Sequence, residues 1–592
     1  IPKRDWSSDV CSSDLRLLNP KRGEMMLKKL PPRNVRPWWR DAVTYQIYIR
    51  SFADSNGDGI GDVEGIRSKL PYLQKLGVDA IWITPWYPSP QNDHGYDVSD
   101  YMNIEPDYGT LKDAQKLIDD AHSHGIKVII DIVPNHTSDQ HAWFQAALKS
   151  KPGSPERNRY IFRDGKGPNG DLPPNNWQAV FGGPAWHRIT EPDGKLGQWY
   201  LHLFAVEQPD VNWENPEVQH HFEEVLRFWL DKGVDGFRID VAHGMFKEAG
   251  LPDIREGWVA KLFGRNNLTR MLSPEHKPFW DQEGVHDIYR RWRKILDSYP
   301  GDRMAVAEAW VSPASRIARY VRSDELQNSF NFEMLTTLWK PEEIRKKIDN
   351  SIAALAEVGA PTSWVFNNHD VVRSVDRLDL GLTNHGESTF SRQGDPAKLN
   401  IARGTLRARS ATLMALALPG GTYLYQGEEL AVPEVRDIPE NRLTDPRWKM
   451  SGYKDRGRDG CRVPIPWKTS PQGAFGFSAN KDLKPEEAWL PASSWWGQYS
   501  AESQENDPQS TLNIYRKALA VRKTESGLGD GEMEWISAGS DVVAFTRPGN
   551  FACYINFGSD IELPADSTVL VASGPLNGNR LPTDTAVWLR TK

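Results

Sequence analysis

Cysteine is scarce in this sequence, and the three that occur, Cys11, Cys461 and Cys553, lie far apart among 592 residues. Small disulfide-stabilised domains use an even and closely spaced set of cysteines. The pattern therefore excludes a disulfide framework and favours a reducing compartment, so we expect the protein to be cytoplasmic.

Long apolar runs and an excess of one charge are also missing. No segment approaches the roughly 18 consecutive apolar residues of a membrane-spanning helix. The chain has 72 Lys and Arg against 79 Asp and Glu, a net charge of -7. This balance disfavours nucleic acid and anionic membranes as partners. We therefore expect a small-molecule partner, and a monomer or small homo-oligomer.

The first 24 residues are polar and lack the apolar core of a secretory signal. Within them, KRDWSSDVCSSDL at residues 3–15 is similar to translated sequencing-adaptor sequence. We therefore expect residues 1–24 to be a non-native tail, with a native disordered tail as the alternative. Met25 or Met26 is then the expected native start.

From residue 42 onward, short apolar runs alternate with segments whose apolar residues recur at helical spacing, as Ala114, Leu117, Ile118 and Ala121 do. The runs are continuously apolar, which is typical of parallel strands covered on both faces. Eight strands are expected, at residues 42–52, 78–85, 126–136, 235–240, 304–310, 328–335, 363–370 and 422–429. Strands that alternate with helices in this way predict an α/β fold, a (β/α)8 TIM barrel.

Two regions depart from this alternation. Residues 137–206 follow the third strand and are rich in Gly, Pro and Asn, so we expect an irregular inserted domain there. Near the C-terminus, the runs VVAFT, FACYINF and STVLVAS are separated by turn residues, which predicts an antiparallel β domain over 507–592. The barrel itself would then comprise residues 25–136 and 207–506.

Polar side chains collect at the ends of four of these strands. They are Asp131, Asn135 and His136 on the third, Arg238 and Asp240 on the fourth, Glu308 on the fifth, and Asn368, His369 and Asp370 on the seventh. Any single one could be an ordinary cap or turn residue. In a barrel, however, these ends meet at one face, where active sites lie, so the four groups together predict a site.

Three carboxylates without the Cys and His spacing of a metal site favour acid/base chemistry. Hydrolysis of a glycosidic bond needs one carboxylate to attack or to activate water, and a second to protonate the leaving oxygen. Asp240 follows Arg238 by two residues, so both side chains point the same way along a strand, and the guanidinium would keep Asp240 ionised. Glu308 lies among small apolar residues and a tryptophan, surroundings that favour the neutral form of a general acid.

Several segments around these residues resemble those of a known family. DIVPNH, GFRID, AVAEAW and NNHD resemble the four signature regions of the α-amylase superfamily, glycoside hydrolase family 13, and occur in the same order. QPDVN (208–212), GYDVSDY (95–101) and YQGEE (425–429) are similar to segments of its oligo-1,6-glucosidase and α-glucosidase branch. The resemblance covers nearly all of residues 37–592 and implies a retaining glycoside hydrolase without an organic cofactor.

The resemblance implies a catalytic role for four residues. Asp240 would be the nucleophile, and Glu308 would be the general acid and then the base. Asp370 would bind two sugar hydroxyls and stabilise the distorted transition state. Arg238 would orient Asp240.

The resemblance also implies which residues contact the sugar. His136 and His369 would bind hydroxyls of the glucose in the reactive subsite, and Tyr96 would stack on that sugar. Asp97 and Arg373 would hold the glucose at the non-reducing end and close the site behind it, which makes the enzyme exo-acting. In the next subsite Arg462 would reach a substrate hydroxyl, with a surface salt bridge as the alternative.

A loop after the first strand has the pattern of a cation site. Its oxygen ligands fall at alternate positions, namely Asp54, Asn56, Asp58, the Ile60 carbonyl and Asp62. The pattern begins like an EF-hand, but Gly65 stands where the EF-hand has its bidentate Glu. The resemblance implies a structural Ca²⁺ or Mg²⁺ here, and the alternative is an Asx-rich turn without a metal.

The residue after Asp240 bears on linkage specificity. The resemblance associates Val241 with α-1,6 linkages, whereas the continuation Ala242-His243-Gly244-Met245 is more similar to α-glucosidases that act on maltose-like α-1,4 linkages. We therefore expect an exo-acting α-glucosidase on short oligosaccharides or disaccharides, with α-1,4 favoured. The alternatives are an oligo-1,6-glucosidase, a transglucosylase or sucrose-acting relative and, remotely, a non-catalytic binding protein.

Overall fold

The computed structural model describes residues 35–255, 277–382 and 395–592. The chain divides into one unit over residues 1–36 and a second over residues 37–592. The expected N-terminal tail, residues 1–24, lies outside the described residues, and so does Cys11. All helices and strands of the described residues belong to the second unit.

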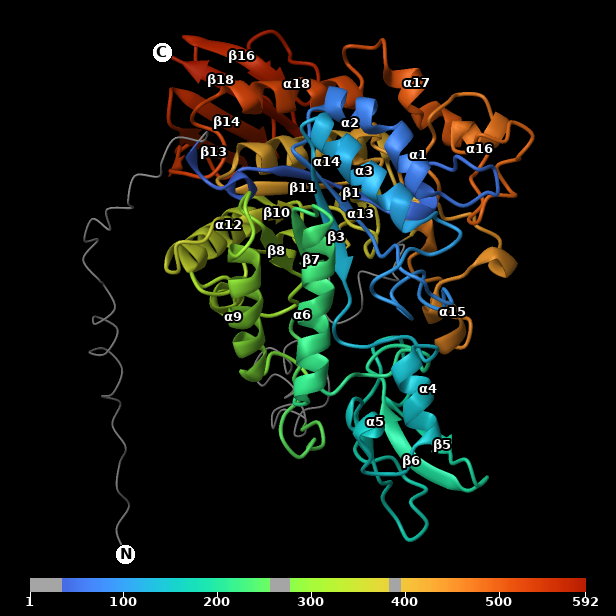
Figure 1. Ribbon diagram of the computed structural model, residues 1–592. Coiled ribbons are helices and arrows are strands. Elements are labelled where there is room, and N and C mark those ends of the chain that lie inside the picture. The colour runs from blue at the N-terminus through green and yellow to red at the C-terminus, as the bar shows by residue number, and fades with distance from the viewer. Residues whose placement is uncertain (1–34, 256–276, 383–394) are drawn as a thin grey trace, which may run out of the picture. The chain divides into compact units, whose positions relative to one another are not determined.

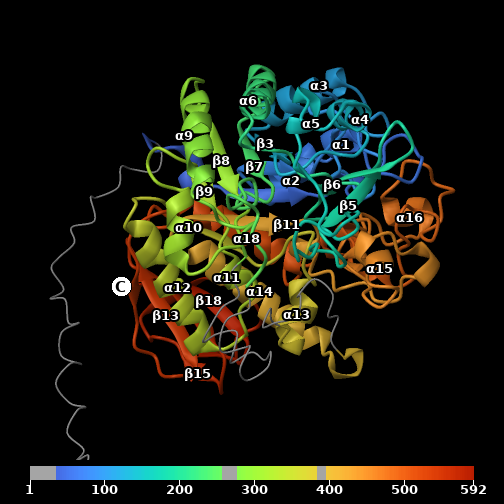
Figure 2. The same ribbon diagram turned by 90° about the horizontal axis from the view of Figure 1, so that it is seen from below.

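Eight parallel strands form one sheet, in the order β10-β11-β1-β2-β3-β7-β8-β9 (Figures 1 and 2). A backbone hydrogen bond of 3.2 Å from Asn331 N–H to the Ser363 carbonyl links the two ends of this order, so the sheet is nearly closed. The predicted TIM barrel is therefore confirmed. The strands are β1 (Val43–Ile47), β2 (Ala80–Ile83), β3 (Lys127–Ile132), β7 (Gly236–Ile239), β8 (Met304–Ala307), β9 (Asn328–Ser329), β10 (Ser363–Val365) and β11 (Gly421–Tyr425).

The predicted strands extend too far at their C-terminal ends. The sixth stops at Ser329, because the Asn331 side chain accepts a hydrogen bond from Met334 N–H and so starts the helix α11 (Phe332–Leu335). The eighth stops at Tyr425, since Gly427 has a φ of 81° and begins a 3-10 turn. At both ends, polar residues that were expected on a strand lie instead in the loop that follows it.

Helices cover the outside of the barrel. In α6 the Asn215 side chain caps Glu217 N–H and Pro216 occupies the first turn, so the helix starts where the sequence predicts. The barrel helices are α1 (Val63–Ser68), α2 (Leu70–Leu76), α3 (Leu111–Ser123), α6 (Pro216–Asp231), α9 (Gly284–Asp297), α10 (Ala314–Tyr320), α11, α12 (Pro341–Ala356), α13 (Ser374–Leu380) and α14 (Ile401–Ala417). Further along the chain follow α15 (Pro446–Met450), α16 (Gln472–Gly476), α17 (Ala501–Gln504) and α18 (Thr511–Thr524).

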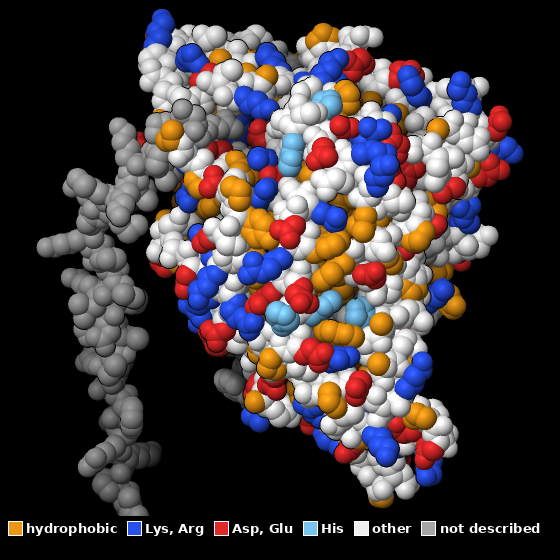
Figure 3. Space-filling model, viewed as in Figure 1, with side chains coloured by type: hydrophobic (Ala, Val, Ile, Leu, Met, Phe, Trp, Pro, Cys, Tyr) orange, Lys and Arg blue, Asp and Glu red, His pale blue; other side chains and the backbone are white. Residues whose placement is uncertain are grey.

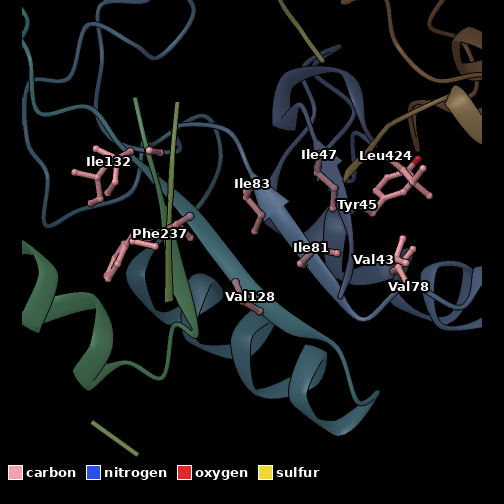
Figure 4. Close-up of a cluster of buried hydrophobic side chains, with 14 of the residues drawn as sticks. Val43, Tyr45, Ile47, Val78, Ile81, Ile83, Val128, Ile132, Phe237 and Leu424 are labelled. Atoms are coloured by element: carbon pink, nitrogen blue, oxygen red, sulfur yellow. The ribbon is translucent and has the colours of Figure 1, made fainter. Parts of the chain in front are cut away.

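The core lies between the strands and these helices. Side chains of β1, β2, β3, β7 and β11 gather there, among them Tyr45, Ile47, Ile83 and Phe237 (Figure 4). Each of these four side chains is completely buried. Because the strands are covered on both faces, their apolar runs are continuous rather than alternating.

Residues 137–206 leave the barrel after β3 and form a small antiparallel sheet of three strands, in the order β4-β6-β5. An isolated bridge between His136 and Asp210 joins the points where the chain departs and returns. Trp177 and Trp186 are buried together with Phe279 from the loop after β7. The elements are α4 (Ala142–Lys149), α5 (Pro155–Asn158), β4 (Phe162–Arg163), β5 (Trp186–Thr190) and β6 (Leu196–Leu201).

The C-terminal region is an antiparallel β domain, as predicted. Five strands pair in the order β12-β13-β14-β18-β16, and β15 pairs with β17. Trp588 on β18 donates its indole N–H to the Leu413 carbonyl of α14, which anchors this sheet to the barrel. The strands are β12 (Glu534–Trp535), β13 (Val542–Arg547), β14 (Phe551–Asn556), β15 (Ile561–Glu562), β16 (Ser567–Ala572), β17 (Arg580–Leu581) and β18 (Thr585–Thr591).

The surface agrees with the balanced composition. On the face that Figure 3 shows, acidic and basic side chains are interspersed, without an extended region of one sign. Throughout the described part of the chain, no helix combines the length and apolar character needed to cross a membrane.

Candidate active site

A cavity of about 740 Å³ opens at the C-terminal ends of the barrel strands. Six of the predicted site residues line it, namely Tyr96, His136, Asp240, Glu308, His369 and Asp370. The inserted segment and the loop after β7 supply its apolar wall, which includes Val180, Phe181, Phe204 and Trp280. The barrel thus brings together polar groups from four strand ends, and the insertion covers them.

Arg238 binds three carboxylates, and we call these four residues the Arg238 cluster. Its Nη1 lies 2.6 Å from Asp131 Oδ1 and 2.7 Å from Asp240 Oδ1, and its Nη2 lies 2.7 Å from Glu308 Oε2. Asp131 pairs directly with Arg238 in the register of β3 and β7, so the parallel sheet itself sets this contact. Arg238 and Asp131 are buried, whereas Asp240 and Glu308 also line the cavity.

The Arg238 cluster has one positive charge for three carboxyl groups. Burial raises the pKa of Asp131 to about 6, against the opposing effect of Arg238. Burial also raises the pKa of Asp240 well above its usual value, and Glu308 adds to this shift while Arg238 opposes it. The sequence predicts that Arg238 keeps Asp240 ionised, but one guanidinium is shared by three buried acids. Burial therefore favours the protonated form of Asp131 and Asp240, and Arg238 opposes it.

A turn after β7 links the two central acids. Val241 has a φ of 44°, in the left-handed region that costs a β-branched residue roughly 1–3 kcal/mol. In this conformation its N–H donates to Glu308 Oε2 at 2.9 Å, and Ala242 N–H donates to the Glu308 carbonyl at 2.9 Å. The strained turn thus fixes Glu308 relative to Asp240.

The two predicted histidines are held in single orientations. Tyr96 Oη lies 2.7 Å from His369 Nε2 and Gln46 Nε2 lies 2.6 Å from its Nδ1, while the Tyr96 and His369 rings stack with planes 5° apart. His136 Nε2 lies 3.1 Å from both the Tyr96 carbonyl and Gln208 Nε2. Burial lowers the pKa of His136 to about 4 and that of His369 well below its usual value. Both imidazoles are therefore neutral at pH 7.

A second arginine also binds three carboxylates, and we call this group the Arg458 cluster. Arg458 Nη2 lies 2.9 Å from Asp93 Oδ1, its Nη1 lies 3.0 Å from Asp370 Oδ1, and its Nε lies 2.6 Å from Asp445 Oδ2. Arg462 Nη2 lies 2.9 Å from the same Oδ1 of Asp370 that Arg458 binds. Burial opposes ionisation of Asp370, but His369 and the two guanidiniums outweigh it and hold the pKa of Asp370 well below its usual range. Asp370 is therefore a stable anion on the cavity wall.

The structure corrects the placement of the predicted pair Asp97 and Arg373, neither of which lines the cavity. Asp97 is completely buried, and it accepts hydrogen bonds from Ser89 Oγ and from the N–H groups of Asn92 and Asp93. Arg373 donates to the carbonyls of Gln426, at 3.0 Å, and Cys461, at 2.8 Å. Both side chains are engaged in holding loops. Asp93 and Arg458 occupy the cavity wall instead.

Arg462 also lies behind the wall rather than on it. Its side chain is completely buried, its Nε donates to the His369 carbonyl at 2.8 Å, and its Nη1 lies 3.0 Å from His94 Nδ1. The predicted contact with a substrate hydroxyl is therefore replaced by support of Asp370. The alternative, a surface salt bridge, is excluded by the same burial.

The cavity residues that the sequence does not predict lie within segments already singled out. Asp93 precedes Asp97 by four residues in NDHGYD, and Arg458 precedes Arg462 by four in RDGCR. In each segment, the sequence-based prediction selects the residue of the same type four positions further along the chain, Asp97 instead of Asp93 and Arg462 instead of Arg458. Asp131 is predicted only as a strand-end residue, and the pairing of β3 with β7 would have placed it beside Arg238.

In the loop of the predicted cation site, two of the carboxylates accept hydrogen bonds from N–H groups of the same loop. Asp54 accepts hydrogen bonds from the N–H groups of Gly57 and Gly59, and Asp62 accepts from Ser55 and caps α1 through Gly65 N–H. Within residues 35–255, 277–382 and 395–592, no three Asp, Glu, His or Cys side chains are grouped as metal ligands.

Comparisons with known proteins agree with this geometry. Residues 46–531 match the family model described as alpha amylase, catalytic domain. A probable alpha-glucosidase of Rhizobium meliloti is 36% identical over 557 residues, which cover 92% of this chain and 93% of that protein. An oligo-1,6-glucosidase of Parageobacillus thermoglucosidasius is 37% identical over 519 residues, 82% of this chain and 84% of that protein.

Among solved structures, an alpha-glucosyl transfer enzyme is similar with a TM-score of 0.80 and 35% identity. The match covers 94% of this chain and 100% of that one. The family model extends over most of the barrel, and the Arg238 cluster lies within it. The chain therefore belongs to the α-amylase family of glycoside hydrolases.

Proposed function

We propose that this protein is a retaining, exo-acting α-glucosidase that releases glucose from the non-reducing end of short α-glucosides. The observation that supports this best is the Arg238 cluster, in which one guanidinium binds both Asp240 and Glu308 within a cavity. Retaining enzymes place their two carboxyl groups about 5–5.5 Å apart, whereas inverting enzymes leave room for a water molecule between the base carboxylate and the sugar. Two acids that share one guanidinium fit the shorter separation.

In the first step, a carboxylate oxygen of Asp240 attacks C1 of the glucose. The bond from C1 to the glycosidic oxygen breaks, its electron pair goes to that oxygen, and Glu308 gives the oxygen a proton. In the second step, Glu308 takes a proton from water, the water oxygen bonds to C1, and Asp240 leaves. The first step therefore needs Asp240 ionised and Glu308 protonated.

The Arg458 cluster supports exo action. Asp93, Asp370 and Arg458 all line the cavity, and Arg458 links the other two directly. Charged groups held in fixed positions discriminate well between sugars, since a missing hydroxyl leaves them without a partner. We infer that this group binds the hydroxyls of the terminal glucose and blocks further subsites behind it.

Product analysis with maltose, isomaltose and sucrose tests the proposal. We expect glucose from maltose, less from isomaltose, and none from any substrate with Asp240→Asn. Asp287→Asn, which changes an exposed carboxylate that pairs with Arg290, is the matched control and should keep full activity. Faster release from isomaltose would make the protein an oligo-1,6-glucosidase. Equal turnover by wild type and Asp240→Asn would contradict the role of Asp240.

A transglucosylase is the second candidate, and the outer wall of the cavity favours it. This wall is an apolar surface on which a second sugar could bind and take the place of water as acceptor. It consists of Val180, Phe181, Phe204 and Trp280. One of the similar structures is named as an alpha-glucosyl transfer enzyme. Accumulation of trisaccharides at high maltose concentration would support this activity, whereas glucose as the sole product would exclude it.

We further propose that the loop from Asp54 to Asp62 binds Ca²⁺ or Mg²⁺ in a structural role. Support comes from the alternate spacing of its oxygen donors, and binding would have to replace hydrogen bonds within the loop. Adding Ca²⁺ to chelator-treated protein should raise the melting temperature of the wild type but not that of Asp58→Asn. An identical shift in both proteins, or none in the wild type, would contradict the proposal.

We also propose a cytoplasmic location. Cys461 and Cys553 are buried and free, which suits a reducing compartment. Fractionation of cells that express the native gene should recover the activity with the cytoplasm. Recovery from the medium or the periplasm would contradict this location.

A further inference from the structure

The two carboxyl oxygens of Glu308 have different neighbours. Oε2 accepts from Arg238 Nη2 at 2.7 Å and from Val241 N–H at 2.9 Å. Oε1 accepts from the indole Nε1–H of Trp310 at 3.1 Å. Trp310 follows Glu308 by two residues beyond the end of β8, and both side chains line the cavity.

This difference determines which oxygen holds the proton of the neutral acid. Oε2 already accepts two N–H groups, so both of its lone pairs are engaged. Among the described residues, Oε1 accepts one N–H group, that of Trp310, so a position for a proton remains. The Glu308 carboxyl also lies within hydrogen-bond reach of Asp240. Because an indole N–H can donate but never accept, the O–H of Glu308 must point away from Trp310. The indole therefore turns that O–H away from itself, toward the side on which Asp240 and the cavity lie.

Neighbouring aromatic rings hold the indole in this position. The Trp310 ring stacks on Phe332 with centroids 3.9 Å apart and planes 9° apart. Phe332 is 5% exposed and contacts Phe330, at a centroid distance of 5.5 Å. Phe332 begins α11, so the element that follows the next barrel strand sets the direction of the indole N–H.

We propose that Trp310 is a positioning residue for the acid/base step, acting through Glu308. This inference rests on the proposed function. When the proton leaves Oε1 for the glycosidic oxygen, the C1–O bond breaks and its electrons stay on that oxygen. A negative charge then develops on Oε1, and the indole N–H stabilises it until water returns a proton.

Two substrates with different leaving groups test this role. Maltose needs a proton on its leaving oxygen, whereas α-glucosyl fluoride releases fluoride, which departs as an anion. For Trp310→Phe, which keeps the ring and removes the N–H, we expect kcat/KM to fall about ten- to a hundredfold with maltose, mostly in kcat. With α-glucosyl fluoride the fall should stay below threefold. Glu308→Gln should show the same split, with a larger loss.

Trp535→Phe is the matched control. It removes an indole hydrogen bond of the same kind, from Nε1 to Asp349 Oδ1 at 2.7 Å, on an exposed part of the C-terminal domain. This variant should leave both substrates unaffected. If Trp310→Phe does not fold, Phe332→Leu keeps the N–H but releases the ring, and should show the same split with a smaller loss.

The outcomes separate this inference from the proposed function. Equal losses with both substrates would mean that Trp310 only maintains the cavity, and no loss with either would mean that it has no role; both results overturn the inference. If the wild type cleaves neither substrate, the proposed function itself fails, and the inference fails with it. If the wild type is active and Glu308→Gln shows the split while Trp310→Phe does not, only the inference is wrong.

Discussion

The Arg238 cluster and the Arg458 cluster each place three carboxylates around one buried guanidinium, yet their charges differ. In the first, a single cation faces three acids, and the pKa values of Asp131 and Asp240 are raised. In the second, Arg462 adds another cation, and the pKa values of Asp370 and Asp445 lie well below their usual range, whereas burial raises the pKa of Asp93 against both guanidiniums. Burial therefore favours protonated acids in the first cluster. In the second, Asp370 and Asp445 stay ionised, which suits the binding of hydroxyl groups.

The two clusters also differ in how the chain builds them. Every member of the Arg238 cluster lies at or next to the end of β3, β7 or β8, which are neighbours in the barrel. The members of the Arg458 cluster lie in loops, and the chain separation between Asp93 and Arg458 is 365 residues. In the proposed mechanism, the residues that break and form bonds thus lie on the sheet, and the residues that select the substrate lie on loops.

The largest expected effect separates the two arginines by kinetics. A lysine has one compact charge and cannot bridge two carboxylates as a guanidinium does. We expect Arg238→Lys to lower kcat about 1,000-fold with KM within threefold, because Asp240 and Glu308 lose their common anchor. Arg458→Lys should raise KM about tenfold or more and lower kcat by less than tenfold.

Steady-state kinetics with maltose measure both effects. Arg67→Lys, at a partly exposed ion pair with Glu64, is the matched control and should change neither constant. The same pattern of kcat and KM in both cluster variants would contradict a division between chemistry and binding.

An intermediate effect distinguishes Asp93 from Asp97. Asp93→Asn should lower kcat/KM about a hundredfold with little change in melting temperature, because Asp93 lines the cavity and pairs with Arg458. Asp97→Asn should instead lower the free energy of unfolding by about 2 kcal/mol, since an amide cannot accept both backbone N–H groups that the carboxylate binds. Its kcat/KM should fall by less than tenfold. Kinetics and thermal melting of the two variants side by side provide the test. A greater loss of kcat/KM for Asp97→Asn than for Asp93→Asn would favour the substrate-binding role that the sequence predicts for Asp97.

The smallest expected effect is the pH dependence of stability. Asp131 has a folded pKa of about 6, above its unfolded value, so the folded state binds its proton more tightly. Its contribution to stability is complete at low pH and is lost as pH rises through 6, which amounts to about 1 kcal/mol between pH 5 and pH 7. Asp131→Asn should lack this loss.

Urea unfolding at pH 5 and pH 7 measures the difference between wild type and variant. Asp287→Asn should follow the wild type, because its carboxylate is largely exposed. A steeper loss in Asp131→Asn than in the wild type would show that folding does not raise the pKa of Asp131.

The same contrast explains what could be predicted from the sequence. The barrel strands, and the residues at their ends such as Asp240 and Glu308, follow from local patterns, because apolar runs mark the strands and the fold brings their ends together. Strand lengths were overestimated because Asn331 and Gly427 end two of them through local caps and turns.

The loop-built part of the site was beyond the same approach. Each of these loops offers two residues of the same type four positions apart, Asp93 with Asp97 and Arg458 with Arg462. Only the folded loops decide which member of each pair faces the cavity. The sharing of Arg238 among three acids likewise depends on packing. A pairwise interpretation of Arg238 with Asp240 therefore left out Asp131 and Glu308, which bind the same guanidinium.

The anomeric form of the first glucose released tests the proposed mechanism most directly. Proton NMR during the first minutes of maltose hydrolysis resolves α-glucose from β-glucose before the two interconvert. Attack by Asp240, followed by attack of water on the same face from which the leaving group departed, predicts that α-glucose appears first. If β-glucose appeared first, Asp240 would not form a covalent bond to the sugar, and the Arg238 cluster would have to activate water instead.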